Sequence, residues 1–218
     1  MSKERNKAAF LAEYGGANQT KKVFEFDKEW VNSPDKTFYR RDHFLANNFL
    51  NNQFTHPDIV KHFAEKDDKF ISHPNLPQEI LDKEFEDGYP SKKALQSPNI
   101  SRKNIDSIAK NHPNFSRYHA DLVRNPKLSK ECIDRLTEPD ILNQIDDSAK
   151  VYVLRNPNTT ADHVHRIIDS SKSKHSDLII NNVASHSKFD QSHFDKIKDS
   201  KIDAYAQTFL KEKGFIKS

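Results

Sequence analysis

Two stretches in the C-terminal half decide the fold: NPKLSKECIDRL at residues 125–136 and NPNTTADHVHRI at residues 156–167. Each begins with Asn-Pro, and proline ends the preceding helix because it pushes the residue before it out of the α region. Ser129 and Thr160 follow in the position of a helix N-cap. Apolar residues then recur at helical spacing. Both stretches therefore predict the same local unit, a turn that leads directly into a helix.

Related tetrads occur along most of the chain, and five of the six carry proline in the second place. They are HPDIV at residue 56, HPNLP at 73, SPNIS at 97, NPKLS at 125, NPNTT at 156 and HSKFD at 186. The spacings are 17, 24, 28, 31 and 30 residues, so the period settles near 30 after an irregular start.

A second apolar helical segment is predicted in each later unit, at residues 116–124, 148–155, 176–184 and 204–212. A single pair of short helices cannot bury its apolar stripe alone, whereas stacked pairs share one continuous core. We therefore predict an all-α fold, a right-handed α-solenoid of helical-hairpin repeats.

The composition agrees with a thin repeat fold and argues against several common classes. Apolar residues make up 34% of the chain and charged residues 31%. Four glycines leave little support for a Rossmann or P-loop site, which needs glycine for tight turns at phosphates. The net charge of +3 lacks the strong basic excess of a generic nucleic-acid binder. Neither a signal peptide nor a membrane-spanning run is expected, which predicts a cytoplasmic protein that does not contact a membrane.

The stretches at 125–136 and 156–167 resemble the leucine-rich repeat variant family, a HEAT-like α-solenoid. Similar arrays with Asn-Pro-Asn repeats are typical of bacteriophage proteins, and the resemblance covers about residues 56–200. It implies a protein-binding solenoid, such as a phage accessory, anti-host or virion-associated factor, in the host cytoplasm or the virion. The family's founding member carries a cysteine-ligated iron–sulfur cluster, but Cys132 is the only cysteine here, so no cofactor is expected.

Residues 1–55 do not fit the repeat and are predicted to form an irregular N-terminal cap or arm before a solenoid at residues 56–218. Residues 7–16 predict a short helix stopped by Gly15 and Gly16. Residues 21–31 predict a strand or an irregular segment. A cap would shield the first repeat, whereas an arm would dock on a partner. The aromatic and arginine residues that favour an arm are Trp30, Phe38, Tyr39, Arg40, Arg41 and Phe44.

Equivalent positions in stacked repeats form rows, and two rows are basic. One contains Arg135, Arg166 and Lys196, and the other contains Arg124 and Arg155. Packed helices lie about 10 Å apart, so such a ridge would match phosphates or an acidic protein surface. Alternatively, the cations pair with an adjacent row of aspartates: Asp82, Asp106, Asp134 and Asp195.

No catalytic or metal-binding constellation is recognisable in the sequence. His163 and His165 lie two residues apart on a predicted helix and therefore point to different faces. His56 and His73 precede the repeat proline, which indicates a turn-capping role, and Cys132 is interpreted as structural. We therefore predict a non-enzymatic protein that binds a protein partner, with nucleic-acid binding through the basic ridge as the alternative. The sequence does not define an oligomeric state.

Overall fold

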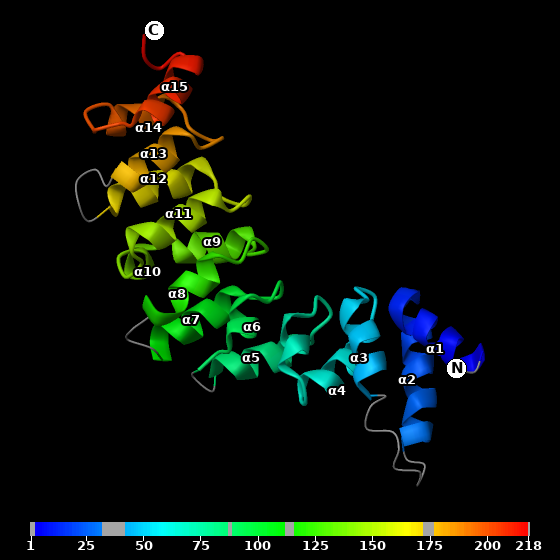
Figure 1. Cartoon of the computed structure of the whole chain (residues 1–218). Helices are drawn as coiled ribbons and strands as arrows, with labels where there is room; N and C mark the ends of the chain where they lie inside the picture. Colours follow the sequence, from blue (N-terminus) through cyan, green and yellow to red (C-terminus); the bar gives the residue numbers. More distant parts are fainter. Residues whose placement is uncertain (1–2, 32–41, 87–88, 112–115, 172–176, 218) are drawn as a thin grey trace. The chain divides into compact units, whose positions relative to one another are not determined.

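The computed structural model describes residues 3–31, 42–86, 89–111, 116–171 and 177–217. These residues form helices and no strand (Figure 1), so the prediction of an all-α fold is confirmed. The contacts divide the chain into two compact units, residues 1–99 and residues 100–218, which are considered separately below. Within the described ranges, no helix has the length and apolar character needed to cross a bilayer. The predicted boundary after residue 55 remains a prediction.

Unit 1 consists of short helices joined by tight turns. They are α1 (Lys3–Tyr14), α2 (Ala17–Val31), α3 (Asp42–Asn51), α4 (Pro57–Ala64), the 3₁₀ helix η2 (Asp68–Ser72), α5 (Gln78–Glu86) and α6 (Lys92–Leu95). The predicted stop after α1 is present, because the Gly15 N–H donates to the Leu11 carbonyl at 2.9 Å. A Cβ at Gly15 would collide with that same oxygen, which explains the glycine.

Residues 21–31 belong to α2, so the predicted strand or irregular segment is wrong. Thr20, Val23 and Phe24 are all buried, and this spacing of three and four residues is helical. The Phe24 ring packs edge-on against Phe49 of α3 and Phe63 of α4, with centroids 6.2 and 5.9 Å apart. Burial of this aromatic face favours the helix over the β-propensity of the segment.

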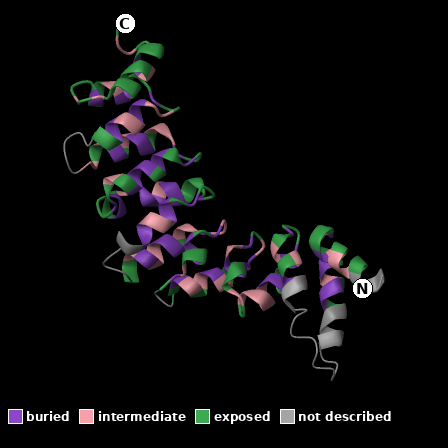
Figure 2. Cartoon of the chain, in the orientation of Figure 1, coloured by how far each residue is buried: buried purple, intermediate pink, exposed green. Residues whose placement is uncertain are grey.

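Unit 2 consists of two layers of helices (Figure 1). The first-helix layer contains α7 (Arg102–Asn111), α9 (Lys130–Leu136), α12 (Ala161–Asp169) and α14 (Gln191–Ile197). The second-helix layer contains α8 (Ser116–Val123), α11 (Asp147–Arg155), α13 (Asp177–Ala184) and α15 (Ala204–Glu212), and α10 (Pro139–Leu142) is a short extra helix. Helix α11 packs on α8 and α13, and α13 packs on α15. Buried residues, purple in Figure 2, occur in helices of both layers.

A four-residue repeat turn separates each helix pair from the next. The first residues of these turns are Asn52, His73, Ser97, Asn125, Asn156 and His186. In every turn, the side chain of this residue accepts a hydrogen bond from the backbone N–H two residues later, at 2.9–3.3 Å. The side chains of Asn, Ser and His can each place an acceptor atom within hydrogen-bond distance of this N–H, as in Asx-turns. This shared geometry explains why three residue types alternate at one position.

The first repeat turn begins at Asn52, so the register predicted at His56 is wrong. His56 is the N-cap of α4, and its Nδ1 accepts from the Asp58 N–H at 3.2 Å. Thr55 instead closes the turn, because its hydroxyl donates to the Phe49 carbonyl at 2.7 Å, and Thr159 makes the same bond six residues back. The spacing to the turn at His73 is therefore 21 residues.

Side chains of one turn also donate to backbone carbonyls of the preceding turn. The amide of Asn75 donates to Gln53 O at 2.7 Å and Thr55 O at 2.9 Å, and the amide of Asn158 donates to Leu128 O at 2.7 Å. The Nε2 of His73 lies 3.1 Å from Asn52 O, and Asn156 reaches Asn125 O at 3.3 Å. These bonds fix the register of neighbouring repeats within each unit.

Candidate partner-binding face

The buried polar residues near the helix starts in unit 2 have structural partners. The Cys132 thiol is fully buried with its Sγ 3.2 Å from Ile100 O, and burial raises its pKa. His163 is buried, accepts from the Thr160 N–H at 3.0 Å and places its Nε2 2.6 Å from Asp134 Oδ1. The interpretation of Cys132 as structural therefore agrees with its contacts. Because these side chains are buried, a ligand cannot reach them.

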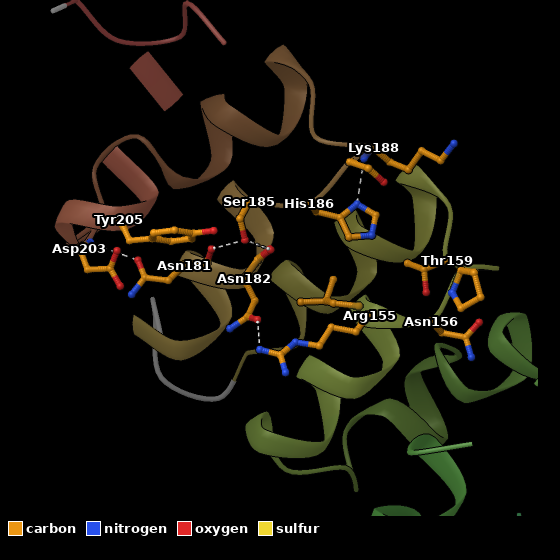
Figure 3. Close-up of a pocket in the computed structure, with 13 residues that line it drawn as sticks. Arg155, Asn156, Thr159, Asn181, Asn182, Ser185, His186, Lys188, Asp203 and Tyr205 are labelled. Atoms are coloured by element: carbon orange, nitrogen blue, oxygen red, sulfur yellow. Dashed lines mark hydrogen bonds between the residues drawn. The ribbon is translucent and has the colours of Figure 1, made fainter. Parts of the chain in front are cut away.

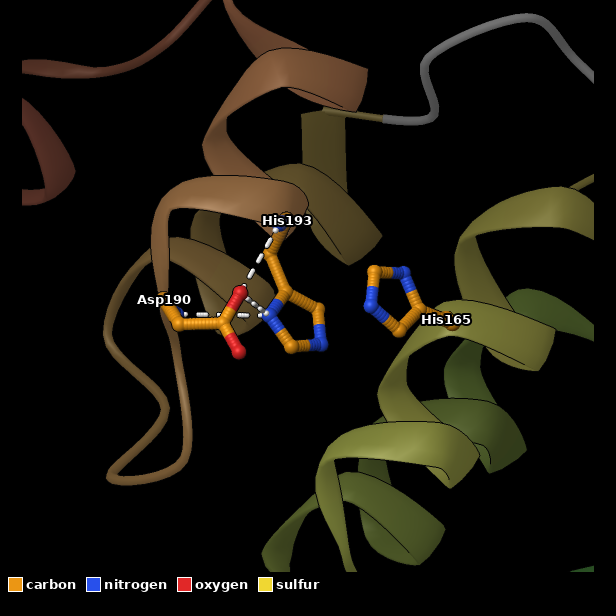
Figure 4. Close-up of side chains that lie close together, drawn as sticks. All are labelled: His165, Asp190 and His193. Atoms are coloured by element: carbon orange, nitrogen blue, oxygen red, sulfur yellow. Dashed lines mark hydrogen bonds and ion pairs between the residues drawn. The ribbon is translucent and has the colours of Figure 1, made fainter.

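One histidine pair meets across neighbouring repeats, where the sequence analysis did not look for it. The rings of His165 and His193 are stacked with centroids 3.9 Å apart and an interplanar angle of 11° (Figure 4). The Nδ1 of His193 lies 2.7 Å from Asp190 Oδ1, and its Nε2 lies 3.0 Å from Ala161 O. A hydrogen bond from the Ser192 hydroxyl lowers the pKa of the Asp190 carboxyl.

Ligand atoms of His165, Asp190 and His193 lie within 4.8 Å of one another, as a metal site requires. However, the nitrogen lone pairs of parallel stacked rings lie in two parallel planes. They cannot both point at one ion at the ~2.0–2.1 Å that zinc requires. The stacked rings therefore pack together at the start of α14, and they would have to rotate before they could hold a metal ion.

The row that contains Arg135, Arg166 and Lys196 lies on the first helices of the repeats and is called the first-helix row. Carboxylates partly neutralise it. Arg135 is buried and donates to Asp140 at 2.8 and 2.9 Å and to Glu138 at 2.9 Å, and the bonds to Asp140 raise its pKa. Lys196 donates to both oxygens of Asp169 at 2.7 Å. Both cations thus pair with carboxylates, but Asp169 lies outside the predicted aspartate row, and Asp106 is the member of that row that contacts Arg135.

The remaining predicted cation of this row, Arg166, donates to the Thr137 hydroxyl at 3.3 Å. Of the predicted aspartate row, Asp106 contacts Arg135, and Asp134 contacts Lys130 and His163. This row thus consists mainly of structural contacts between repeats and leaves little positive charge for a ligand.

The other basic row, Arg124 and Arg155, lies at the ends of the second helices and is called the second-helix row. Its contacts are different. The Arg124 guanidinium carbon lies 4.9 Å from the centroid of the Tyr152 ring, and Arg155 Nη2 donates to Asn182 Oδ1 at 3.1 Å. Tyr152 and Asn182 occupy the same repeat position, four residues before the turns at 156 and 186. Each arginine thus crosses to the next helix of the layer. Among the described residues, neither arginine forms an ion pair with a carboxylate.

Large apolar side chains of the second-helix layer are also exposed. In the described part of unit 2 they are Tyr152, Leu178 and Tyr205, with 36%, 46% and 73% of their surface exposed. All three belong to the second-helix layer, on α11, α13 and α15. We call this surface the second-helix face and define it by Arg124, Tyr152, Arg155, Leu178, Asn182 and Tyr205.

A groove of about 530 Å³ opens on this face between the turns at 156 and 186 and helices α13 and α15 (Figure 3). Arg155, Asn181, Asn182 and Tyr205 line it together with Lys188. The Asp203 N–H donates to Asn181 Oδ1 at 3.1 Å, which leaves the Asn181 amide N–H groups as donors. The groove could not be predicted from the sequence, because no motif indicates that these side chains meet.

The residues predicted for an N-terminal arm are not tested. Phe38, Tyr39, Arg40 and Arg41 lie outside the described residues. Trp30 belongs to α2 and Phe44 to α3, but their side chains lie outside the described part of the chain.

No protein family, curated protein or solved structure matches this chain. The predicted membership in the leucine-rich repeat variant family therefore stays a prediction.

Proposed function

We propose that this chain is a non-enzymatic helical-repeat protein that binds a protein partner through the second-helix face. The observation that carries the proposal is the contrast between the two basic rows. Arg135 and Lys196 pair with acids, whereas Arg124 and Arg155 contact Tyr152 and Asn182 instead. Arginine and tyrosine beside exposed apolar side chains are the residue types that contribute most to binding at protein interfaces.

A protein partner fits the face better than a nucleic acid does. The net charge of the chain is only +3, and two cations of the first-helix row are neutralised. A nucleic-acid ligand would need several unpaired cations in a row, because phosphate contacts supply most of its affinity.

The proposal includes the predicted right-handed α-solenoid and a role as a phage accessory, anti-host or virion-associated factor. The layered helix pairs and the bonds between successive turns support a solenoid, because each repeat contacts its neighbours through equivalent residues. The phage role rests on the sequence resemblance alone, and so does a location in the host cytoplasm or the virion.

Affinity capture with paired charge-reversal variants tests the proposal. The bait proteins are the wild type, Arg124→Glu/Arg155→Glu, and the control Lys110→Glu/Lys198→Glu, which makes the same charge change on exposed residues at the ends of α7 and α14. Circular dichroism establishes that all three are equally helical. We expect the partner to remain with the wild type and the control and to bind at least tenfold more weakly to the face variant, a difference of about 1.4 kcal/mol.

Equal capture by the face variant would show that the partner binds elsewhere. Release of the captured material by nuclease would favour the nucleic-acid alternative instead.

A further inference from the structure

We propose that the groove at Arg155 binds an extended acidic peptide segment of the partner, with two carboxylates three residues apart. This inference rests on the proposed function and names the chemistry that the second-helix face recognises. The groove lies wholly within unit 2, and its walls come from the end of α11, from α13, from two repeat turns and from the start of α15.

The groove is rich in hydrogen-bond donors. Arg155 is exposed and held by one bond to the neutral Asn182 amide, so the rest of its guanidinium faces the groove unpaired among the described residues. Lys188 is exposed, and its side chain extends away from Arg155 and Asn181 (Figure 3), so its ammonium is not one of these donors. Asn181 contributes amide N–H groups, because its oxygen is occupied by the Asp203 N–H. A carboxylate matches this set, since a guanidinium binds it through two parallel hydrogen bonds.

The two arginines determine the spacing of the ligand. Arg124 and Arg155 hold equivalent positions at the ends of α8 and α11, and these helices pack side by side. Packed helices lie about 8–10 Å apart. A polyproline II chain rises about 3.1 Å per residue with three residues per turn, so every third side chain lies on one face about 9 Å from the last. An acidic residue, two intervening residues and a second acidic residue therefore match the spacing of the helices that carry Arg155, which lines the groove, and Arg124, which lies outside it.

The rest of the face suits a peptide more than a compact anion. Tyr152 lies under the Arg124 guanidinium with 36% of its surface exposed, and Tyr205 is 73% exposed at the groove wall. The exposed ring of Tyr205 is suitable for prolines or other apolar residues between the acids. Asp203 lies in the same wall and limits the negative charge that the groove accepts, which disfavours polyphosphate chains.

Fluorescence polarisation with labelled synthetic peptides tests the inference on the full-length chain. The probe repeats Glu-Pro-Pro three times. One comparison peptide has the same composition with its acidic residues two positions apart. A second has lysine in place of glutamate. An oligothymidine of equal charge tests binding of nucleic acid. The protein variants are Arg124→Gln/Arg155→Gln and the control Lys110→Gln/Lys198→Gln.

We expect the three-residue spacing to bind at least tenfold more tightly than the two-residue spacing or the lysine peptide. The face variant should lose at least tenfold in affinity, and the control variant should match the wild type. Equal binding of both acidic spacings, tighter binding of oligothymidine, or no loss in the face variant would overturn the inference. If the charge-reversal capture succeeds while the acidic probe does not bind, the face is correct and the ligand class is wrong. If both fail, the proposed function fails as well.

Discussion

Replacement of Asn52 by alanine should destabilise unit 1 far more than replacement of His56, although only His56 is followed by proline. The Asn52 side chain is 3% exposed, donates to Ala12 O at 3.0 Å and Gly15 O at 2.8 Å, and accepts from the Phe54 N–H at 2.9 Å. Each buried bond contributes about 1 kcal/mol, so Asn52→Ala should cost about 3 kcal/mol. His56→Ala removes one capping bond and should cost about 1 kcal/mol.

Urea unfolding measures this difference. Trp30 is the only tryptophan of the chain and lies in unit 1, so its fluorescence reports on that unit, and circular dichroism follows both units. The free energies of unfolding come from linear extrapolation, with equal slopes as the condition for comparison. A cost for His56→Ala that equals or exceeds the cost for Asn52→Ala would refute the register deduced for the first repeat turn.

Three further predictions concern the internal contacts of the chain. Arg135→Ala should lower the free energy of unfolding by about 2 kcal/mol, because it leaves several carboxylates without their cation. Lys196→Ala should lower it by less than about 1 kcal/mol, because the ion pair of Lys196 is exposed. Urea unfolding compares the two variants. Burial lowers the pKa of His73, so the wild type should lose stability as pH falls below about 6.5. His73→Asn should keep the turn and reduce this loss, and the part that remains comes from His165 and His186, whose pKa values burial also lowers. Cys132 should react with a disulfide reagent only after unfolding, because burial raises its pKa; rapid reaction in native buffer would contradict its packing.

The sequence predicted the helix pairs of unit 2 because their signals are local. Proline or a polar cap marks each turn, and apolar spacing marks each helix, as at Ser129 before α9. The first turn was not predicted because Gln53 stands where the next four turns have proline, and the proline at residue 57 starts the next helix. Residues 21–31 were misjudged because their burial depends on aromatic rings from α3 and α4.

The candidate face could be predicted only in part. The repeat spacing placed Arg124 and Arg155 in one row, and in the structure each arginine contacts the equivalent position of the next helix. The choice between a binding ridge and internal ion pairs required distances, because Arg135 finds its acids on the adjacent helix α7 and at Asp140, five residues farther on. The groove and the exposed Tyr205 depend on how α13 and α15 pack.

Oxidative footprinting of tyrosines in the captured complex tests the central claim most directly. Tyr152 and Tyr205 lie on the second-helix face, whereas Tyr89 is 76% exposed in unit 1 and serves as an internal control. Binding should protect Tyr152 and Tyr205 severalfold and leave Tyr89 unchanged. Unaltered modification of Tyr152 and Tyr205 in a stable complex would contradict the assignment of this face as the binding surface.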